Sequence, residues 1–181
     1  LAGIDCQIIR LPDISAKEPI ENFLLLVPRQ SATKLEEALA QAECRALTQQ
    51  DFEILRILQG EVGGGEMGGK YTPFELGLAD IVSGKKGCYT GQEVLARQVT
   101  YSKISKGPVL LSSDQRLQPG SRVLMDGQVV GASESSTETV DLGAISLAIL
   151  RLDRIHHGDE VQIRSDSGEV SARIVHILTQ P

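Results

Sequence analysis

The chain has 181 residues, a formal net charge of −6 and 41% hydrophobic residues. This length suffices for one domain or two small ones, and the composition is typical of a soluble globular protein. An acidic chain without a basic run lacks the electrostatic footprint of a nucleic-acid-binding surface. Because no apolar stretch reaches about 18 residues and no signal-peptide pattern occurs, we expect a cytoplasmic protein that does not span a membrane.

Cysteine and histidine usage narrows the possible chemistry. The three cysteines are an odd number at wide spacing, which predicts free thiols in a reducing compartment: Cys6, Cys44 and Cys88. No C-x-x-C pair occurs, and no histidine stands at metal-ligand spacing from a cysteine or a carboxylate pair. We therefore expect no metal site.

Residues 1–101 are predicted to form an α+β domain. The apolar run over residues 22–27 predicts a buried strand. Apolar residues then recur at helical spacing over residues 31–43, and Thr33 and Glu36 fit a capping box at the start of that helix.

A second helix is predicted between Thr48 and Gly60. The pattern Thr48-x-x-Asp51 fits a helix N-terminus, and glycine is the usual residue just past a helix end. Apolar positions at Ile54, Leu55 and Leu58 would line one side of this helix.

A glycine-rich run from Gly63 to Lys70 follows and partly fits the G-x-x-x-x-G-K pattern of a phosphate-binding loop. That pattern needs Ser or Thr after the lysine to hold magnesium, but Tyr71 stands there and no hydrophobic strand precedes the run. We therefore predict a flexible loop that approaches a ligand closely. Glu66 within this loop is either a ligand contact or a solvated charge. Glu75, whose direction Pro73 constrains, has the same two interpretations.

Cys88 stands in the run Lys-Lys-Gly-Cys-Tyr-Thr-Gly-Gln-Glu at residues 85–93. Thr90 and Glu93 fit a capping box, so a short helix is predicted to begin here. The positive end of that helix and two neighbouring ammonium groups favour a thiolate, which makes Cys88 a candidate reactive thiol or soft-metal ligand. The alternative is a small buried residue at a turn.

Residues 102–181 are predicted to form a small antiparallel β-barrel domain. Asp126-Gly127 is a hairpin-turn signal. Six short strand candidates occur at roughly regular spacing, as in small barrels, at residues 109–111, 122–125, 129–130, 144–150, 160–164 and 170–178.

The run from Lys86 to Glu93, followed by Ala96-Arg97, resembles the defining motif of the YgfZ-type folate-binding proteins. These proteins are relatives of the glycine-cleavage T-protein, an aminomethyltransferase. The similarity covers most of residues 50–165. It includes the segments Leu55 to Gly60, Tyr71 to Leu78, Gly120 to Val123, Val130-Gly131 and Gly143 to Ile145.

This resemblance implies a partial ferredoxin-like folate-binding region that carries the motif, followed by the C-terminal β-barrel. The implied cofactor is tetrahydrofolate or a derivative of it. Family members are longer on the N-terminal side, so this chain is expected to lack that part. The resemblance implies a functional thiol at Cys88 and folate contacts at Lys86, Gly87, Tyr89, Gly91, Gln92, Glu93, Arg97, Glu66 and Glu75.

For the YgfZ-type branch the implied function is assembly or repair of iron–sulfur clusters, with effects on cluster-dependent tRNA modification. Folate and iron–sulfur proteins or assembly factors would be the partners. The T-protein lacks the Lys-Gly-Cys-Tyr motif, and Leu58 stands where its folate-facing glutamate would be. A folate-dependent aminomethyltransferase and a non-catalytic binding domain remain the alternatives. A single cysteine is too few to hold a cluster, so a partner or thiol exchange would be required.

Overall fold

The computed structural model describes residues 3–14, 19–101, 103–140, 143–166 and 168–178. The chain divides into two compact units, Leu1–Gln49 and Gln50–Pro181. The domain boundary that the sequence predicts at residue 101 stays a prediction. None of the helices in the described ranges is long and apolar enough to cross a membrane.

The first unit contains an antiparallel hairpin and one helix. Strands β1 (Gln7–Ile14) and β2 (Ile20–Leu26) pair with each other alone. The strand predicted over residues 22–27 is therefore found, but its predicted burial is wrong, since Phe23 is 48% exposed and Leu26 is 46% exposed. A two-stranded sheet gives each side chain only one neighbouring strand to pack against.

The helix of this unit, α1 (Ala32–Gln41), follows the 3₁₀ turn η1 (Arg29–Ser31). Its N-cap is Ser31, and no side chain caps it, so the capping box predicted at Thr33 and Glu36 is wrong. The helix begins earlier than that box requires, because the 3₁₀ turn leads directly into it and closes with a bond from the Ser31 amide to the Pro28 carbonyl.

In the second unit, α2 (Gln49–Gln59) ends where the sequence predicts. Gly60 has φ +70° and donates its amide to the Ile57 carbonyl, while the Glu61 amide bonds the Arg56 carbonyl. These two bonds are the Schellman motif, which favours glycine because the conformation is left-handed. Ile57 is fully buried on the apolar side of this helix.

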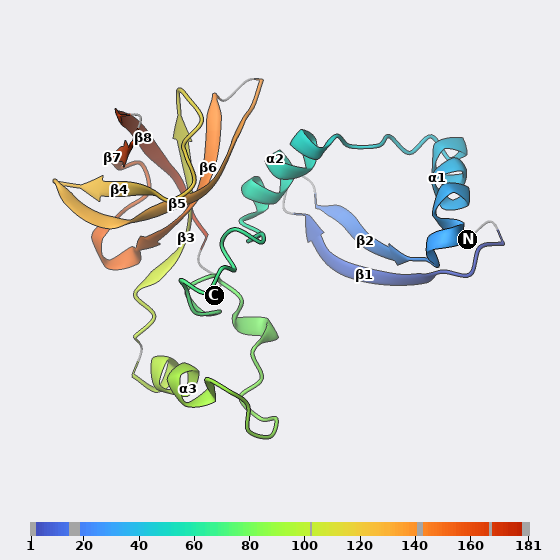
Figure 1. The fold of residues 1–181 in the computed structure, drawn as a ribbon, viewed down its shortest axis with the longest axis horizontal. Coiled ribbons are helices and arrows are strands. Elements are labelled where there is room, and N and C mark those ends of the chain that lie inside the picture. Colours follow the sequence, from blue (N-terminus) through green and yellow to red (C-terminus); the bar gives the residue numbers. More distant parts are fainter. Residues whose placement is uncertain (1–2, 15–18, 102, 141–142, 167, 179–181) are drawn as a thin grey trace. The chain divides into compact units, whose positions relative to one another are not determined.

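The predicted six-stranded antiparallel barrel is confirmed, and it forms most of the second unit (Figure 1). Its strand order is β3-β6-β5-β4-β7-β8, and every neighbouring pair is antiparallel. The strands are β3 (Lys106–Ser113), β4 (Ser121–Met125), β5 (Gln128–Glu138), β6 (Ala144–Arg151), β7 (Glu160–Ser165) and β8 (Gly168–Ile177). The 3₁₀ turn η3 (Leu152–Arg154) follows β6.

The hairpin predicted at Asp126-Gly127 joins β4 to β5. Both residues have positive φ, +50° and +75°, which is the backbone of a type I′ turn. Met125 and Gln128 pair directly across this turn.

Two apolar clusters lie on the two sides of the barrel wall. The interior is filled by side chains such as Val109, Leu111, Leu150 and Ile174. A second cluster packs Ile57 of α2 against alternate residues of β3 and β6, namely Leu110, Ile145, Leu147 and Ile149. Strand β6 is consequently buried on both faces, and α2 is fixed on the outside of the barrel.

Strand β5 carries a bulge that shapes the surface next to α2. Ser133 pairs with Ala148 and Ser135 pairs with Leu147, so Glu134 is an extra residue without a partner of its own. A bulge bends the strand and re-aims its side chains. Glu134 and Ser135 accordingly both contact segments outside the barrel, although neighbours in a regular strand point to opposite faces.

Candidate functional site

The cysteine motif leads into α3 (Gln92–Thr100), so the short helix predicted here is confirmed. Its N-cap is Gly91 in the left-handed conformation, with φ +86° and no side-chain cap. The capping box predicted between Thr90 and Glu93 is therefore wrong, because Gly91 takes the cap position. Glu93 instead forms an ion pair of 2.6 Å with Arg97, one helical turn later.

Cys88 is a free, exposed thiol. This exposure rules out the alternative in which Cys88 is a small buried residue. The preceding turn is held by Ser83, whose hydroxyl accepts the Lys86 amide at 3.2 Å. The Lys86 ammonium lies 4.7 Å from the centre of the Tyr89 ring and forms a cation–π contact with it. These two residues flank the Gly87-Cys88 dipeptide in the sequence.

A pocket of about 360 Å³ lies beside the motif and reaches the turn before η2 (Ala79–Ile81). This volume falls within the range of about 300–1,000 Å³ that small-molecule sites occupy. Tyr89 and Gln92 of the motif line it together with Phe74 and the apolar side of α3. The chain has only three Phe, three Tyr and no Trp, so two of its six aromatic rings stand at this one pocket. Two aromatic side chains and the Gln92 amide suit a flat ligand ring whose edge carries polar atoms.

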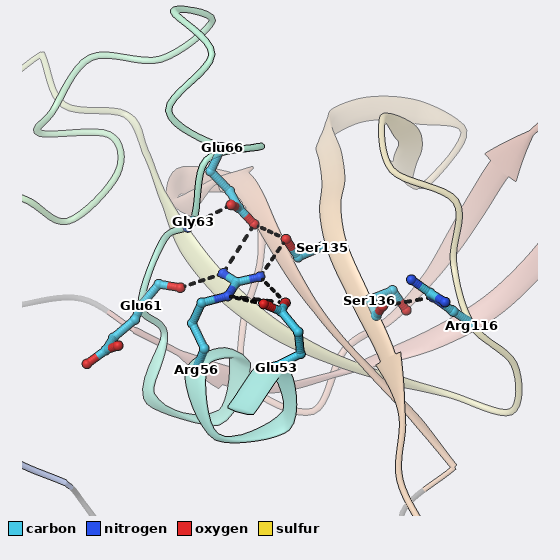
Figure 2. Close-up of polar contacts among 8 residues, drawn as sticks. All are labelled: Glu53, Arg56, Glu61, Gly63, Glu66, Arg116, Ser135 and Ser136. Atoms are coloured by element: carbon cyan, nitrogen blue, oxygen red, sulfur yellow. Dashed lines mark hydrogen bonds and ion pairs between the residues drawn. The ribbon is translucent and has the colours of Figure 1, made fainter. Parts of the chain in front are cut away.

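Glu66 in the glycine-rich loop is almost fully buried, with 1% of its surface exposed. Its carboxylate accepts the Gly63 amide at 2.8 Å and the Ser135 hydroxyl, and Arg56 approaches to 3.7 Å (Figure 2). The interpretation of Glu66 as a solvated charge is therefore wrong. Three donors on one carboxylate fasten the loop to α2 and β5, so the loop is less free than its glycines predict.

Arg56 is the other half of this cluster. Its guanidinium bonds the Glu61 carbonyl at 2.7 Å, the Ser135 hydroxyl at 2.9 Å and Glu53 at 2.7 Å (Figure 2). Burial opposes the charge, but the hydrogen bond to Glu53 and the charge of Glu66 outweigh it and raise the pKa of Arg56. Sequence reasoning missed this residue, although a charged side chain within the apolar Leu-Arg-Ile run is a signal that it has a buried partner.

Glu75 forms a capping box with Thr72. The Thr72 amide donates to Glu75 at 3.0 Å, and the Glu75 amide donates back to the Thr72 hydroxyl at 3.3 Å. Pro73 takes the first helical position, where a backbone N–H would have no partner within the helix, so the lack of this group in proline is not destabilising. A Schellman pair at Gly77, with φ +74°, ends this single turn. The carboxylate is thus held by its own turn, with the Lys106 ammonium 3.9 Å away.

Glu134, the bulge residue of β5, is a buried carboxylate that the sequence does not single out. The Tyr71 hydroxyl donates to it at 2.5 Å, and the Lys70 ammonium lies 3.2 Å from it. Burial, followed by the contact with Glu134, raises the pKa of the Tyr71 phenol. Lys70 and Tyr71 therefore anchor the C-terminal end of the glycine-rich loop, whereas Glu66 anchors its middle.

The predicted site residues fall into two groups. Cys88, Lys86, Tyr89, Gln92 and the Glu93–Arg97 pair share the motif turn and α3, whereas Glu66 and Glu75 serve the loop and turn that precede them. Their roles as folate contacts stay predictions. Within the described ranges no cluster of three His, Cys, Asp or Glu side chains could hold a metal ion.

The architecture matches a known class of fold. Over 87% of its length the chain superposes on the crystal structure of the glycine cleavage system aminomethyltransferase T from Bartonella henselae, with a TM-score of 0.70 and 17% identity. At this identity the likeness shows the fold alone, and that fold is T-protein-like. Among curated proteins the chain is similar to "Putative transferase At1g60990, chloroplastic" of Arabidopsis thaliana, with 27% identity over 162 residues. No family model matches it.

The chain spans only part of both proteins, 38% of the Arabidopsis relative and 46% of the Bartonella chain. The T-protein-like fold that the sequence resemblance implies is thus confirmed. Membership of the YgfZ-type branch and a ferredoxin-like arrangement of the first half stay predictions, and so does a cytoplasmic location.

Proposed function

We propose that the chain belongs to a tetrahydrofolate-binding accessory protein for iron–sulfur cluster assembly or repair, with Cys88 as its reactive thiol. One observation carries the proposal: on a T-protein-like fold, an exposed Cys88 directly precedes Tyr89, which lines a pocket together with Phe74. Tetrahydrofolate or a derivative, a carrier of one-carbon groups, would place its flat pterin ring between Phe74 and Tyr89. The Gln92 amide offers both donors and an acceptor to the polar ring edge.

The surrounding charges suit the rest of such a ligand. Lys86 stands over the Tyr89 ring, and Arg97 lies one turn into α3. Either cation could meet the carboxylates of the glutamate tail. A Cβ added at Gly87 or at Gly91 would meet no atom within 4 Å. The backbone close to Cys88 is therefore accessible to a ligand.

Cys88 would act as a thiolate, either as a transient ligand of iron or in thiol exchange. Clusters commonly take four thiolates, and this chain brings one exposed thiol from the motif. The remaining ligands would come from the partner iron–sulfur protein or assembly factor. In this proposal the effect on cluster-dependent tRNA modification follows from cluster supply to the modifying enzyme, without contact between this protein and tRNA.

The test is complementation of an iron–sulfur enzyme defect in cells that lack the protein, comparing Cys88→Ser with Cys44→Ser. Cys44 is also exposed and free, which makes it a matched control. We expect Cys88→Ser to abolish complementation while folate binding stays within about twofold, because serine keeps the volume. Cys44→Ser should complement normally. If Cys88→Ser complements as well as the wild type, the thiol mechanism is wrong.

A folate-dependent transferase is the second candidate, since the Bartonella structure is an aminomethyltransferase and the Arabidopsis relative is named as a transferase. Leu58 argues against it, because an apolar side chain, here 38% exposed, offers no acceptor where the T-protein uses a glutamate. Turnover of an aminomethyl-loaded carrier protein in the presence of tetrahydrofolate would establish this function instead. Folate binding with neither activity would favour the third alternative, a non-catalytic binding domain.

A further inference from the structure

Two arginines face each other directly on the outside of the barrel, at the β4–β7 pair. Arg122 of β4 is the register partner of Arg164 of β7, and both are exposed. Side chains at directly opposite positions share one face of the sheet, with Cβ atoms about 4.5–5.5 Å apart, and like charges there are destabilising. In a chain of net charge −6 this pairing is not the result of general basicity.

The charges of this pair are only half compensated. Arg164 forms an ion pair of 2.7 Å with Glu169 across the β7–β8 hairpin. Among the described residues, Arg122 has no ion pair with any carboxylate. Glu169 is thus the one carboxylate in the described ranges that forms an ion pair with either arginine, and the Arg122 guanidinium is left to bind an anion.

A polar pocket of about 370 Å³ lies at the same place. Arg122 and Arg164 line it, with Ser165 and Asp166 from the end of β7 and Gln118 and Ser121 from the opposite rim. That rim is held in place, because the Ser121 hydroxyl donates to the Gln118 carbonyl at 2.6 Å and the Gly120 amide bonds the Ser133 carbonyl at 2.7 Å. Asp166 is the one carboxylate in the lining, so an anion would have to sit toward the arginines.

We propose that Arg122 and Arg164 form a binding site for a phosphate group, either free or as a small phosphomonoester. The planar guanidinium group matches phosphate oxygens with two parallel hydrogen bonds, and a phosphate between two such groups would relieve their repulsion. The pocket is larger than a phosphate ion and would also accept a small organic group attached to it. This site is independent of the proposed folate function, since none of its lining residues belongs to the cysteine motif.

The test uses the full chain, with inorganic phosphate and glycerol phosphate as probes and sodium chloride at equal ionic strength as the reference. Binding is followed by phosphorus NMR and by the shift in melting temperature. We expect saturable binding. Arg122→Gln and Arg164→Gln should each weaken it about tenfold or more, because each removes charge-assisted hydrogen bonds to the phosphate. Arg173→Gln is the matched control, because Arg173 is also an exposed barrel arginine and pairs with Glu160 at 3.2 Å.

Folding is not at risk in the key variant. Arg122→Gln removes a like-charge pair, so without phosphate its melting temperature should equal or exceed that of the wild type. If only inorganic phosphate binds, the site is one for the free ion. If glycerol phosphate binds as well, the site also accepts a phosphomonoester. Equal effects of phosphate and chloride, unchanged in Arg122→Gln, would mean an adventitious ion only and overturn the proposal. Tighter binding of an oligonucleotide, lost in Arg122→Gln, would overturn the small-molecule assignment.

Discussion

Tyr71 donates a hydrogen bond of 2.5 Å to Glu134, 63 positions later in the chain. Glu134 is the extra residue of the β5 bulge, and the next residue, Ser135, bonds Glu66 and Arg56. Because the bulge turns both consecutive side chains out of the barrel, the glycine-rich loop is bound to β5 at two points, through Glu66 and through Lys70 with Tyr71. Ser136 then resumes the ladder and accepts Arg116 at its carbonyl, at 2.9 Å (Figure 2).

The Tyr71 phenol makes stability depend on alkaline pH. Its folded pKa is raised, so the folded protein keeps the proton where an unfolded tyrosine loses it, near pH 10. The stabilisation is complete below about pH 10 and is lost as the pH rises toward the folded pKa. We expect Tyr71→Phe to be less stable by about 0.5–1.5 kcal/mol at pH 8. That difference should shrink in urea unfolding above pH 10, whereas a constant difference at all pH values would contradict the assignment.

Glu66 and Ser135 should be energetically coupled. Ser135→Ala leaves the buried carboxylate one donor short, at a cost of about 1–3 kcal/mol in the free energy of unfolding. Contacting residues in one network show coupling of about 0.5–3 kcal/mol, so a double-mutant cycle of Ser135→Ala with Glu66→Gln should be non-additive. Glu160→Gln at an exposed ion pair is the control and should change stability by less than about 0.5 kcal/mol. Additive costs would disprove the coupling.

Gly131 is required for close packing at the β5–β6 pair. A Cβ at this position would lie 2.1 Å from the Ile149 carbonyl oxygen and 2.9 Å from the Leu150 Cα, both backbone atoms. Gly131→Ala should therefore destabilise the barrel by about 1–3 kcal/mol or more. Gly64→Ala, where no atom lies within 4 Å of a built Cβ, is the matched control and should unfold at nearly the wild-type denaturant concentration. Equal midpoints for the two variants would show that the barrel relaxes around the added methyl group.

Two glycines of the cysteine motif should respond differently to alanine. Gly91 holds φ +86° at the start of α3, a conformation that costs an L-residue roughly 1–2 kcal/mol. Gly91→Ala should therefore speed hydrogen exchange of the α3 amides roughly tenfold. Gly87 does not adopt a left-handed conformation, and a Cβ there would meet no atom within 4 Å, so Gly87→Ala should leave exchange unchanged. Similar exchange in both variants would mean that α3 does not depend on the left-handed cap.

The same sequence pattern, T-x-x-E, forms a capping box at Thr72 but not at Thr33 or Thr90. Thr72 and Glu75 form the capping box because Pro73 presets the first helical residue. Thr90 and Glu93 do not, because Gly91 between them adopts the left-handed conformation and becomes the cap itself. The T-x-x-E pattern makes a capping box possible. Whether the box forms at Thr72 and Thr90 depends on the backbone conformation of the residue that follows the threonine.

The sequence by itself determined the features that depend on near neighbours. The Asp126-Gly127 turn and the helix end at Gly60 both follow from backbone preferences within a few residues. Only the tertiary structure decided the burial of Glu66 and Glu134 and their partners. Those contacts join residues 63 to 69 positions apart and depend on a one-residue bulge in β5, which shifts the register of the strand without leaving a local pattern in its sequence.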